Sequence, residues 1–113
     1  AKSGEIETGD TSIIRDFVDV RDVVRAYYQL LMQGKTGEVY NICGEKGVSL
    51  ADVVKEIADI VGVEITTRVN PDFVRPGDNQ MVIGSAAKIC QDIGWKAEIP
   101  LRQTLTDMIE YMR

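Results

Sequence analysis

The chain has 113 residues, 44% of them hydrophobic, and a formal net charge of −5. This length suits one small domain or part of a larger one, and the hydrophobic fraction is too high for a disordered chain. The negative charge argues against a protein that coats nucleic acid, which needs a basic face, but a few arginines in one cleft can still bind a small anion.

The first part of the chain predicts two strands, a helix and a third strand. Glu5–Thr8 and Ile13–Val18 read as strands joined by a Gly-Asp turn. Asp19 is typical of a helix N-cap, and Gly34 of a helix end. Glu38–Cys43 holds closely spaced β-forming residues and predicts a strand. The helix between Asp19 and Gly34 carries an apolar stripe of Val20, Val23, Val24, Tyr27, Leu30 and Leu31.

A second helix and a strand follow. Ser49 is the expected N-cap of this helix, and Asp52, three residues on, completes a capping-box pattern. Gly62 is expected to end the helix. Val63–Val69 alternates and is rich in β-branched residues, which predicts a strand.

The last part predicts a loop, a short strand and two helices. Residues 70–79 contain prolines that prevent regular structure, and Met81–Ile83 is a short strand candidate. Ser85 is the expected cap of a helix that ends before Trp95, a packing anchor. Pro100 belongs in the first turn of a last helix, where its missing amide costs nothing. The whole order predicts a small mixed α/β unit.

The turn Gly44-Glu45-Lys46-Gly47 lies between a predicted strand and a predicted helix. A dinucleotide-binding turn would need a glycine at the position of Ile42 and would run directly into the helix, whereas Val48 and Ser49 intervene. The GxxG loop of an RNA-binding KH module would join two helices and carry basic residues. We therefore predict a plain connecting loop.

Metal-binding residue types are scarce. The chain has no His, and Cys43 and Cys90 have no metal-ligand spacing, so we expect no metal site. Both cysteines stand among apolar residues, which favours buried free thiols, while a disulfide between them stays open. No apolar run approaches the roughly 18 residues of a membrane span, and no signal peptide is recognisable, so the expected location is the cytoplasm.

Two arginine segments are the candidates for ligand binding. Arg15 stands on a predicted strand before Phe17, which we expect to face the core, and its planar guanidinium suits a phosphate. Arg75 and Asp78 flank a Pro-Gly turn that would hold a phosphate donor close to an acceptor for a ribose hydroxyl. Taken singly, each segment is more typical of a surface strand or turn with weak ion pairs.

These two segments belong to a longer pattern of matching motifs. In chain order the motifs are Arg-Asp-Phe-Val-Asp-Val-Arg-Asp-Val-Val-Arg-Ala at 15–26, Gly-Glu-Val-Tyr-Asn-Ile-Cys at 37–43, Arg-Pro-Gly-Asp at 75–78, Ile-Gly-Trp at 93–95 and Ile-Pro-Leu at 99–101. Over about residues 5–113 the chain resembles the C-terminal part of the extended short-chain dehydrogenases that act on nucleotide sugars. Within them it looks most like the GDP-4-keto-6-deoxymannose reductases and GDP-mannose dehydratases.

The resemblance implies a fold and a set of site residues. Residues 1–113 would form a small mixed α/β substrate-binding subdomain of an NAD(P)-binding, Rossmann-type enzyme, without the Rossmann core. Arg15 and Arg75 would contact the substrate diphosphate from two sides, and Asp78 would reach the nucleoside ribose. The chain begins at Ala1 rather than Met, and we expect it to be a fragment of a longer chain.

The resemblance also implies what lies elsewhere. Members bind NAD(P) on an N-terminal Rossmann domain and transfer protons with a Tyr-x-x-x-Lys pair, in which lysine lowers the pKa of the tyrosine. No tyrosine here has a lysine four positions later, so we expect no catalytic and no cofactor-binding residue. The implied partners are a nucleotide sugar, with a GDP-sugar favoured, the Rossmann domain of the same chain, and a second copy in a homodimer. A fragment of a 4-epimerase and a non-catalytic nucleotide-binding module are the alternatives.

Overall fold

The computed structural model describes residues 3–75, 77 and 80–113. The elements in these residues make a small mixed α/β unit, as the sequence predicts, and no helix among them is long and apolar enough to cross a membrane. In chain order they are β1 (Ser3–Thr8), β2 (Ile14–Asp16), α1 (Val20–Gln33), β3 (Gly47–Ser49), α2 (Leu50–Val61), β4 (Glu64–Val69), the 3₁₀ turn η1 (Pro71–Phe73), β5 (Met81–Val82), α3 (Ala87–Ile93) and α4 (Leu101–Met112).

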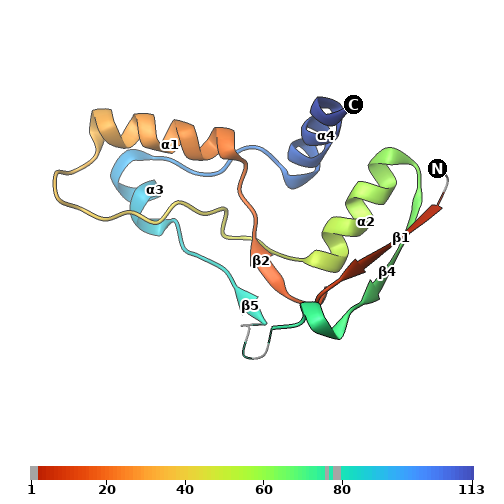
Figure 1. Ribbon diagram of the computed structural model, residues 1–113. Coiled ribbons are helices and arrows are strands. Elements are labelled where there is room, and N and C mark those ends of the chain that lie inside the picture. The colour runs from red at the N-terminus through yellow and green to blue at the C-terminus, as the bar shows by residue number, and fades with distance from the viewer. Residues whose placement is uncertain (1–2, 76, 78–79) are drawn as a thin grey trace.

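The described strands form two small sheets. In one, β1 pairs in parallel with β4; in the other, β2 lies between an antiparallel β3 and a parallel β5. Figure 1 shows α2 beside the β1–β4 pair at one end of the molecule, α1 and α3 together at the other, and β2 between them. The strand that carries Arg15 therefore joins the two halves.

The helix ends follow the sequence signals closely. The Asp19 carboxylate accepts from the amide of Arg21 at 2.7 Å and begins α1, and Gly34 follows its last residue. The Ser49 hydroxyl accepts from the amide of Asp52 at 3.1 Å, and Gly62, with φ of +71°, ends α2 in the left-handed region. The predicted caps of both helices are confirmed.

The start of α3 differs slightly from the prediction. Ser85 accepts from the amide of Ala87 at 3.3 Å, but the residue at the N-cap position is Ala86. The carboxylate of Glu45, from the turn before β3, accepts the amide of Ala86 at 2.9 Å. A side chain that is distant in sequence therefore supplies an acceptor that local pattern could not indicate.

The core lies between α1, α3 and the segment after α3. Trp95 is fully buried, as expected of a packing anchor, and its indole Nε1 donates to the carbonyl of Asp22 at 3.0 Å. Ala26, Ala86 and Ile89 are buried with it. The core therefore depends on residues that are about 70 positions apart in the chain.

The predicted strand Glu38–Cys43 is wrong: within the described part of the chain this segment is extended but joins no sheet. Tyr40, Ile42 and Cys43 pack against the core, whereas Val39 is 79% exposed. A strand needs a neighbouring strand for its backbone hydrogen bonds, and none of the described strands pairs with this segment. The segment therefore alternates between partly buried and exposed side chains as a strand does, but it lacks the hydrogen bonds to a neighbouring strand.

Several expected burials are also wrong. Phe17 is 39% exposed and does not enter the core. Cys43 is half-buried, Cys90 is exposed, and both thiols are free. Four members of the apolar stripe on α1 are more than half exposed: Val20, Val24, Tyr27 and Leu31. The face of α1 that is buried instead carries Asp22 and Ala26, because α3 and Trp95 pack on that side.

Candidate functional site

Arg15 occupies the middle of β2 and is half-buried. Its register neighbours are Val48 of β3 and Val82 of β5. Its Nη1 donates to the carbonyl of Ile14 at 2.8 Å. A strand on each side therefore fixes the backbone from which this guanidinium extends.

Arg75 lies two residues after η1 and is exposed. The Asn70 side chain accepts from the amide of Asp72 at 2.9 Å and starts η1, so the predicted irregular loop contains one 3₁₀ turn. Gly77, two residues after Arg75, has φ of +81°, a backbone angle that favours glycine. Asp78, the third predicted site residue, lies outside the described residues.

Arg75 lines a small hollow of about 230 Å³, between the β1–β2 turn and the segment that follows η1. Asp10 also lines the hollow, and its carboxylate accepts from the Ser12 hydroxyl at 2.5 Å and from the Ser12 amide at 2.9 Å. These hydrogen bonds lower the pKa of Asp10, so it is anionic at neutral pH. The other lining residues are Gly9, Ile13, Leu50, Phe73, Val74 and Gly77.

The pairing of β2 with β5 connects the two arginine segments. The amide of Ile14 donates to the carbonyl of Gln80 at 2.8 Å, and Gln80 Nε2 donates to the carbonyl of Ser12 at 2.8 Å. The chain that leaves the loop of Arg75 is therefore fastened beside the strand of Arg15. Arg15 does not line the hollow, so the structure places the two arginines on connected elements rather than around one cavity.

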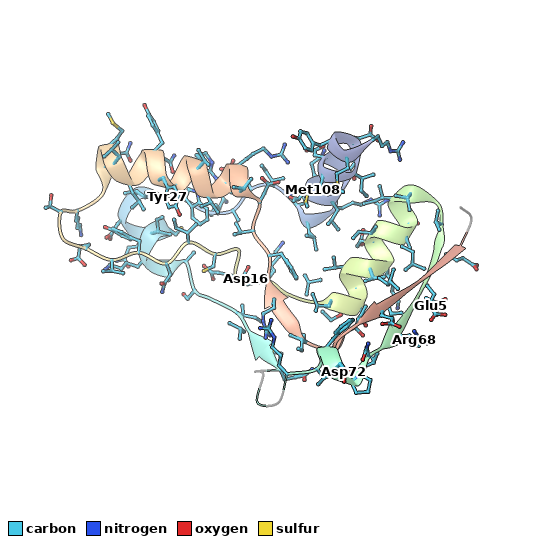
Figure 2. All side chains as sticks on the ribbon, viewed as in Figure 1. Glu5, Asp16, Tyr27, Arg68, Asp72 and Met108 are labelled. Carbon is cyan, nitrogen blue, oxygen red and sulfur yellow. The ribbon has the colours of Figure 1, made fainter. Side chains whose placement is uncertain are left out.

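Asp16, the residue after Arg15, is a feature that the sequence did not indicate. Its Oδ1 accepts from the amide of Gly44 at 3.0 Å, and its Oδ2 from the amides of Glu45 at 2.8 Å and Gly84 at 3.4 Å. Figure 2 shows Asp16 near the middle of the molecule, where β2 meets the extended segment. Residues 44–46 form a connecting loop, as predicted, but Gly47 begins β3, and two amides of the loop bond a carboxylate of this chain.

A larger apolar hollow of about 710 Å³ lies between the start of α1 and α4. Its charged residues bond one another: Arg21 Nη2 lies 2.8 Å from Asp19 Oδ2 and 2.8 Å from Asp107 Oδ2. Its other lining residues are Val18, Val20, Thr104, Met108, Tyr111 and Met112, and Figure 2 shows Met108 on α4. This lining suits an apolar surface better than a charged ligand.

Within the residues that the structure describes, no three His, Cys, Asp or Glu side chains converge to hold a metal ion. The titratable groups with shifted pKa values owe these shifts to hydrogen bonds, ion pairs or burial. Burial raises the pKa of the Cys43 thiol, and the hydrogen bond to Asp92 raises the pKa of Tyr40. Neither shift produces a nucleophile or a base near neutral pH.

Curated relatives match most of this chain and a minor part of their own length. GDP-6-deoxy-D-mannose reductase from Pseudomonas aeruginosa is 36% identical over 104 residues, which cover 92% of this chain and 34% of the relative. dTDP-glucose 4,6-dehydratase from Escherichia coli is 35% identical over 104 residues, 87% of this chain and 29% of the relative. The chain spans about a third of the length of these relatives.

Solved structures agree with this match. RMD from Pseudomonas aeruginosa, complexed with NADPH, superposes with a TM-score of 0.87 at 35% identity, over 94% of this chain and 35% of that one. UDP-glucose 4-epimerase from Thermotoga maritima, with UDP-glucose, gives 0.85 at 31% identity, over 98% and 35%. A family model described as GDP-mannose 4,6 dehydratase matches residues 1–108. The chain therefore belongs to the GDP-mannose 4,6 dehydratase family and has the fold of the C-terminal part of extended short-chain dehydrogenases.

Proposed function

We propose that this chain holds the nucleoside diphosphate of a nucleotide sugar, as the C-terminal subdomain of an NAD(P)-dependent reductase or 4,6-dehydratase. The pairing of β2 with β5 carries the proposal, because it fastens the end of the loop of Arg75 beside the strand of Arg15. Two guanidinium groups on such connected elements can bind the two phosphates from different sides.

The hollow beside Arg75 suits the region next to a diphosphate. The anionic carboxylate of Asp10 would repel a phosphate, so the phosphates belong on the Arg75 side of the hollow. Asp78, in the same loop, is the proposed acceptor for a ribose hydroxyl. GDP is the favoured nucleotide, since a GDP-6-deoxy-D-mannose reductase is among the similar relatives.

The chemistry belongs to the rest of the proposed enzyme. We place NAD(P) on an N-terminal Rossmann domain of the same chain, together with the tyrosine and lysine that transfer protons, in a cytoplasmic enzyme that forms a homodimer. Hydride would move between the nicotinamide and C4 of the hexose, and this subdomain would contribute by orienting the sugar. Two similar solved structures are complexes with NADPH and with NAD.

A nucleotide-sugar 4-epimerase is the second candidate. UDP-arabinose 4-epimerase 3 of Arabidopsis thaliana is 36% identical over 98 residues, the same identity as that of the reductase over 104. This chain would hold the nucleotide in either case, so the two candidates differ in the base that is bound and in the fate of C4.

Replacing each arginine in the full natural protein tests the proposal. Arg15→Ala and Arg75→Ala should each weaken binding of the nucleotide about 10- to 100-fold, the range for loss of a charged hydrogen bond. Affinity for NADP⁺ should stay within about twofold, because the cofactor binds elsewhere. Calorimetric titration with GDP, UDP, dTDP and NADP⁺ measures both effects and identifies the base.

Arg68→Ala is the matched control. Arg68 is an exposed arginine on β4 that pairs with Glu5 and Glu7, and its loss should leave the affinity for every nucleotide unchanged. Equal losses of nucleotide and cofactor affinity in the Arg15 and Arg75 variants, or no loss of either, would show that the diphosphate site is wrongly assigned.

A further inference from the structure

We propose that Asp16 is a positioning residue for this nucleotide site. Its carboxylate connects β2, which carries Arg15, with the turn at 44–45 and with the segment that follows β5. The inference rests on the proposed function and adds a residue that itself touches no ligand. Asp16 bonds the amides of Gly44, Glu45 and Gly84, which come from two segments on either side of the β3–α2–β4 region.

The contacts of Asp16 are sterically demanding. A Cβ atom added to Gly44 would lie 3.0 Å from Asp16 Oδ1, tighter than an ordinary carbon–oxygen contact. A Cβ atom added to Gly84 would lie 2.8 Å from the sulfur of Cys43. Gly44 thus lets the backbone approach Asp16, and Gly84 lets it pass close to Cys43, where no larger residue fits without a shift. The carboxylate and its three donors form one packed unit.

Glu45 extends this unit to α3. It is the one described residue other than glycine with positive φ, at +64°, a conformation that costs free energy and needs surrounding contacts to hold it. In this conformation its amide donates to Asp16 while its own carboxylate accepts the amide of Ala86 at 2.9 Å. Asp16 is therefore linked through Glu45 to the start of α3.

These links bear directly on Arg15. Successive side chains of a strand point to opposite faces, so Asp16 holds β2 from the face opposite to that of Arg15. Gly84 stands two residues after β5, so its bond to Asp16 also secures the β2–β5 pairing. Without the Asp16 carboxylate, three amides lose their acceptor, and the strand of Arg15 gains freedom relative to the loop of Arg75.

Asp16→Asn in the full natural protein tests the inference, because it keeps the size of the side chain but removes the charge and one acceptor oxygen. The Kd for the nucleotide that the natural protein binds best of GDP, UDP and dTDP should rise about tenfold, the effect of one weakened charged hydrogen bond. The Kd for NADP⁺ should stay unchanged. Hydrogen exchange should become faster in peptides that contain Gly44 and Gly84.

A double-mutant cycle with Arg15→Ala separates positioning from general loss of stability. If Asp16 acts through Arg15, Asp16→Asn should cost little further affinity once Arg15 has been replaced. A structural weakening alone would lower affinity by the same factor in both backgrounds. Asp59→Asn, on exposed α2 surface and paired with Arg102, is the matched control and should change neither affinity nor exchange at these peptides.

Glu45→Gln provides a second variant if Asp16→Asn does not fold. This variant weakens the hydrogen bond between the Glu45 side chain and the amide of Ala86 while Asp16 remains. Nucleotide affinity should fall about two- to fivefold, the effect of a partly weakened hydrogen bond. If the natural protein binds a nucleotide and Asp16→Asn binds it equally well, the role of Asp16 is overturned and the proposed function stands. The same conclusion follows from unchanged affinity in Glu45→Gln, where Asp16→Asn does not fold. No binding of any nucleotide by the natural protein would overturn both.

Discussion

Asp22 shows how far one buried side chain can connect this chain. It is 2% exposed on the inner face of α1, and its Oδ2 accepts from the amides of Glu98 at 3.1 Å and Ile99 at 3.0 Å. Its Oδ1 accepts from Arg25 at 3.0 Å, and its backbone carbonyl accepts from Trp95. One aspartate thereby fastens the segment after α3 to α1.

Removal of this carboxylate should be costly. Asp22→Ala should lower the free energy of unfolding by about 3–5 kcal/mol, because it removes the carboxylate that pairs with the partly buried Arg25 and leaves two amides without their acceptor. Asp22→Asn should cost less, since one acceptor oxygen remains. Urea unfolding measures both values. Asp59→Ala, at an exposed ion pair, should change stability by less than about 0.5 kcal/mol, and an equal effect at the two positions would contradict this account.

Asp16 and Asp22 also mark what the sequence could not predict at this scale. Arg15 and Arg75 stand in recognisable motifs, so the sequence could nominate them and the segments in which they lie. The acceptor roles of the two aspartates depend on amides that lie 28 to 77 positions away in the chain. No local pattern carries that information. The predicted burial of Phe17, which is 39% exposed, was wrong for the same reason, because burial depends on packing between segments that a local pattern does not describe.

At the scale of elements, the N-terminus of α1 is a charged cap. Asp19 is 5% exposed and accepts from the guanidinium of Arg21 at 2.8 Å and from the Thr104 hydroxyl at 2.6 Å. These hydrogen bonds, those from Arg21 above all, hold the pKa of Asp19 well below its ordinary value of 3.8. The ionised cap thus ties α1 to α4.

The stability from this cap should depend on pH. Because folding lowers the pKa of Asp19, its stabilisation is fully present above the ordinary value of 3.8 and is lost as pH falls through the lower value in the folded protein. Asp19→Ala should cost about 0.5–2 kcal/mol at pH 7 and progressively less at acid pH. Urea unfolding of both proteins between neutral and acid pH tests this; a difference that stays constant across the range would rule out the ionised cap.

The elements also separate into those that the local sequence specifies and those that it does not, such as Glu38–Cys43. Caps at Asp19 and Ser49 and the stop at Gly62 act through neighbouring backbone groups, and their prediction was correct. Glu38–Cys43 has equally clear β-forming residues, but a strand exists only when another strand pairs with it. The sequence predicts the extended backbone of this segment and cannot supply its partner.

The whole molecule is broad and thin. Its Cα radius of gyration is 16.9 Å, and its principal extents are 50 × 35 × 17 Å. A compact domain of this length has a radius of gyration of about 13 Å. Large apolar side chains are also exposed together along α1 and after it, among them Tyr28 at 65%, Leu31 at 84% and Val39 at 79%. Such a surface is typical of a face that another layer of protein covers.

We infer that the proposed N-terminal domain covers this face, and Leu31→Glu in the full natural protein tests it. If Leu31 is buried there, the introduced carboxylate has no partner, and the free energy of unfolding should fall by about 3 kcal/mol or more. Gln91→Glu, at an exposed site on α3, adds the same charge and should cost less than about 0.5 kcal/mol. Denaturant unfolding compares the two variants. Equal, small effects would mean that the outer face of α1 stays in solvent, whereas a much larger effect at Leu31 would show that this face is covered in the full natural protein.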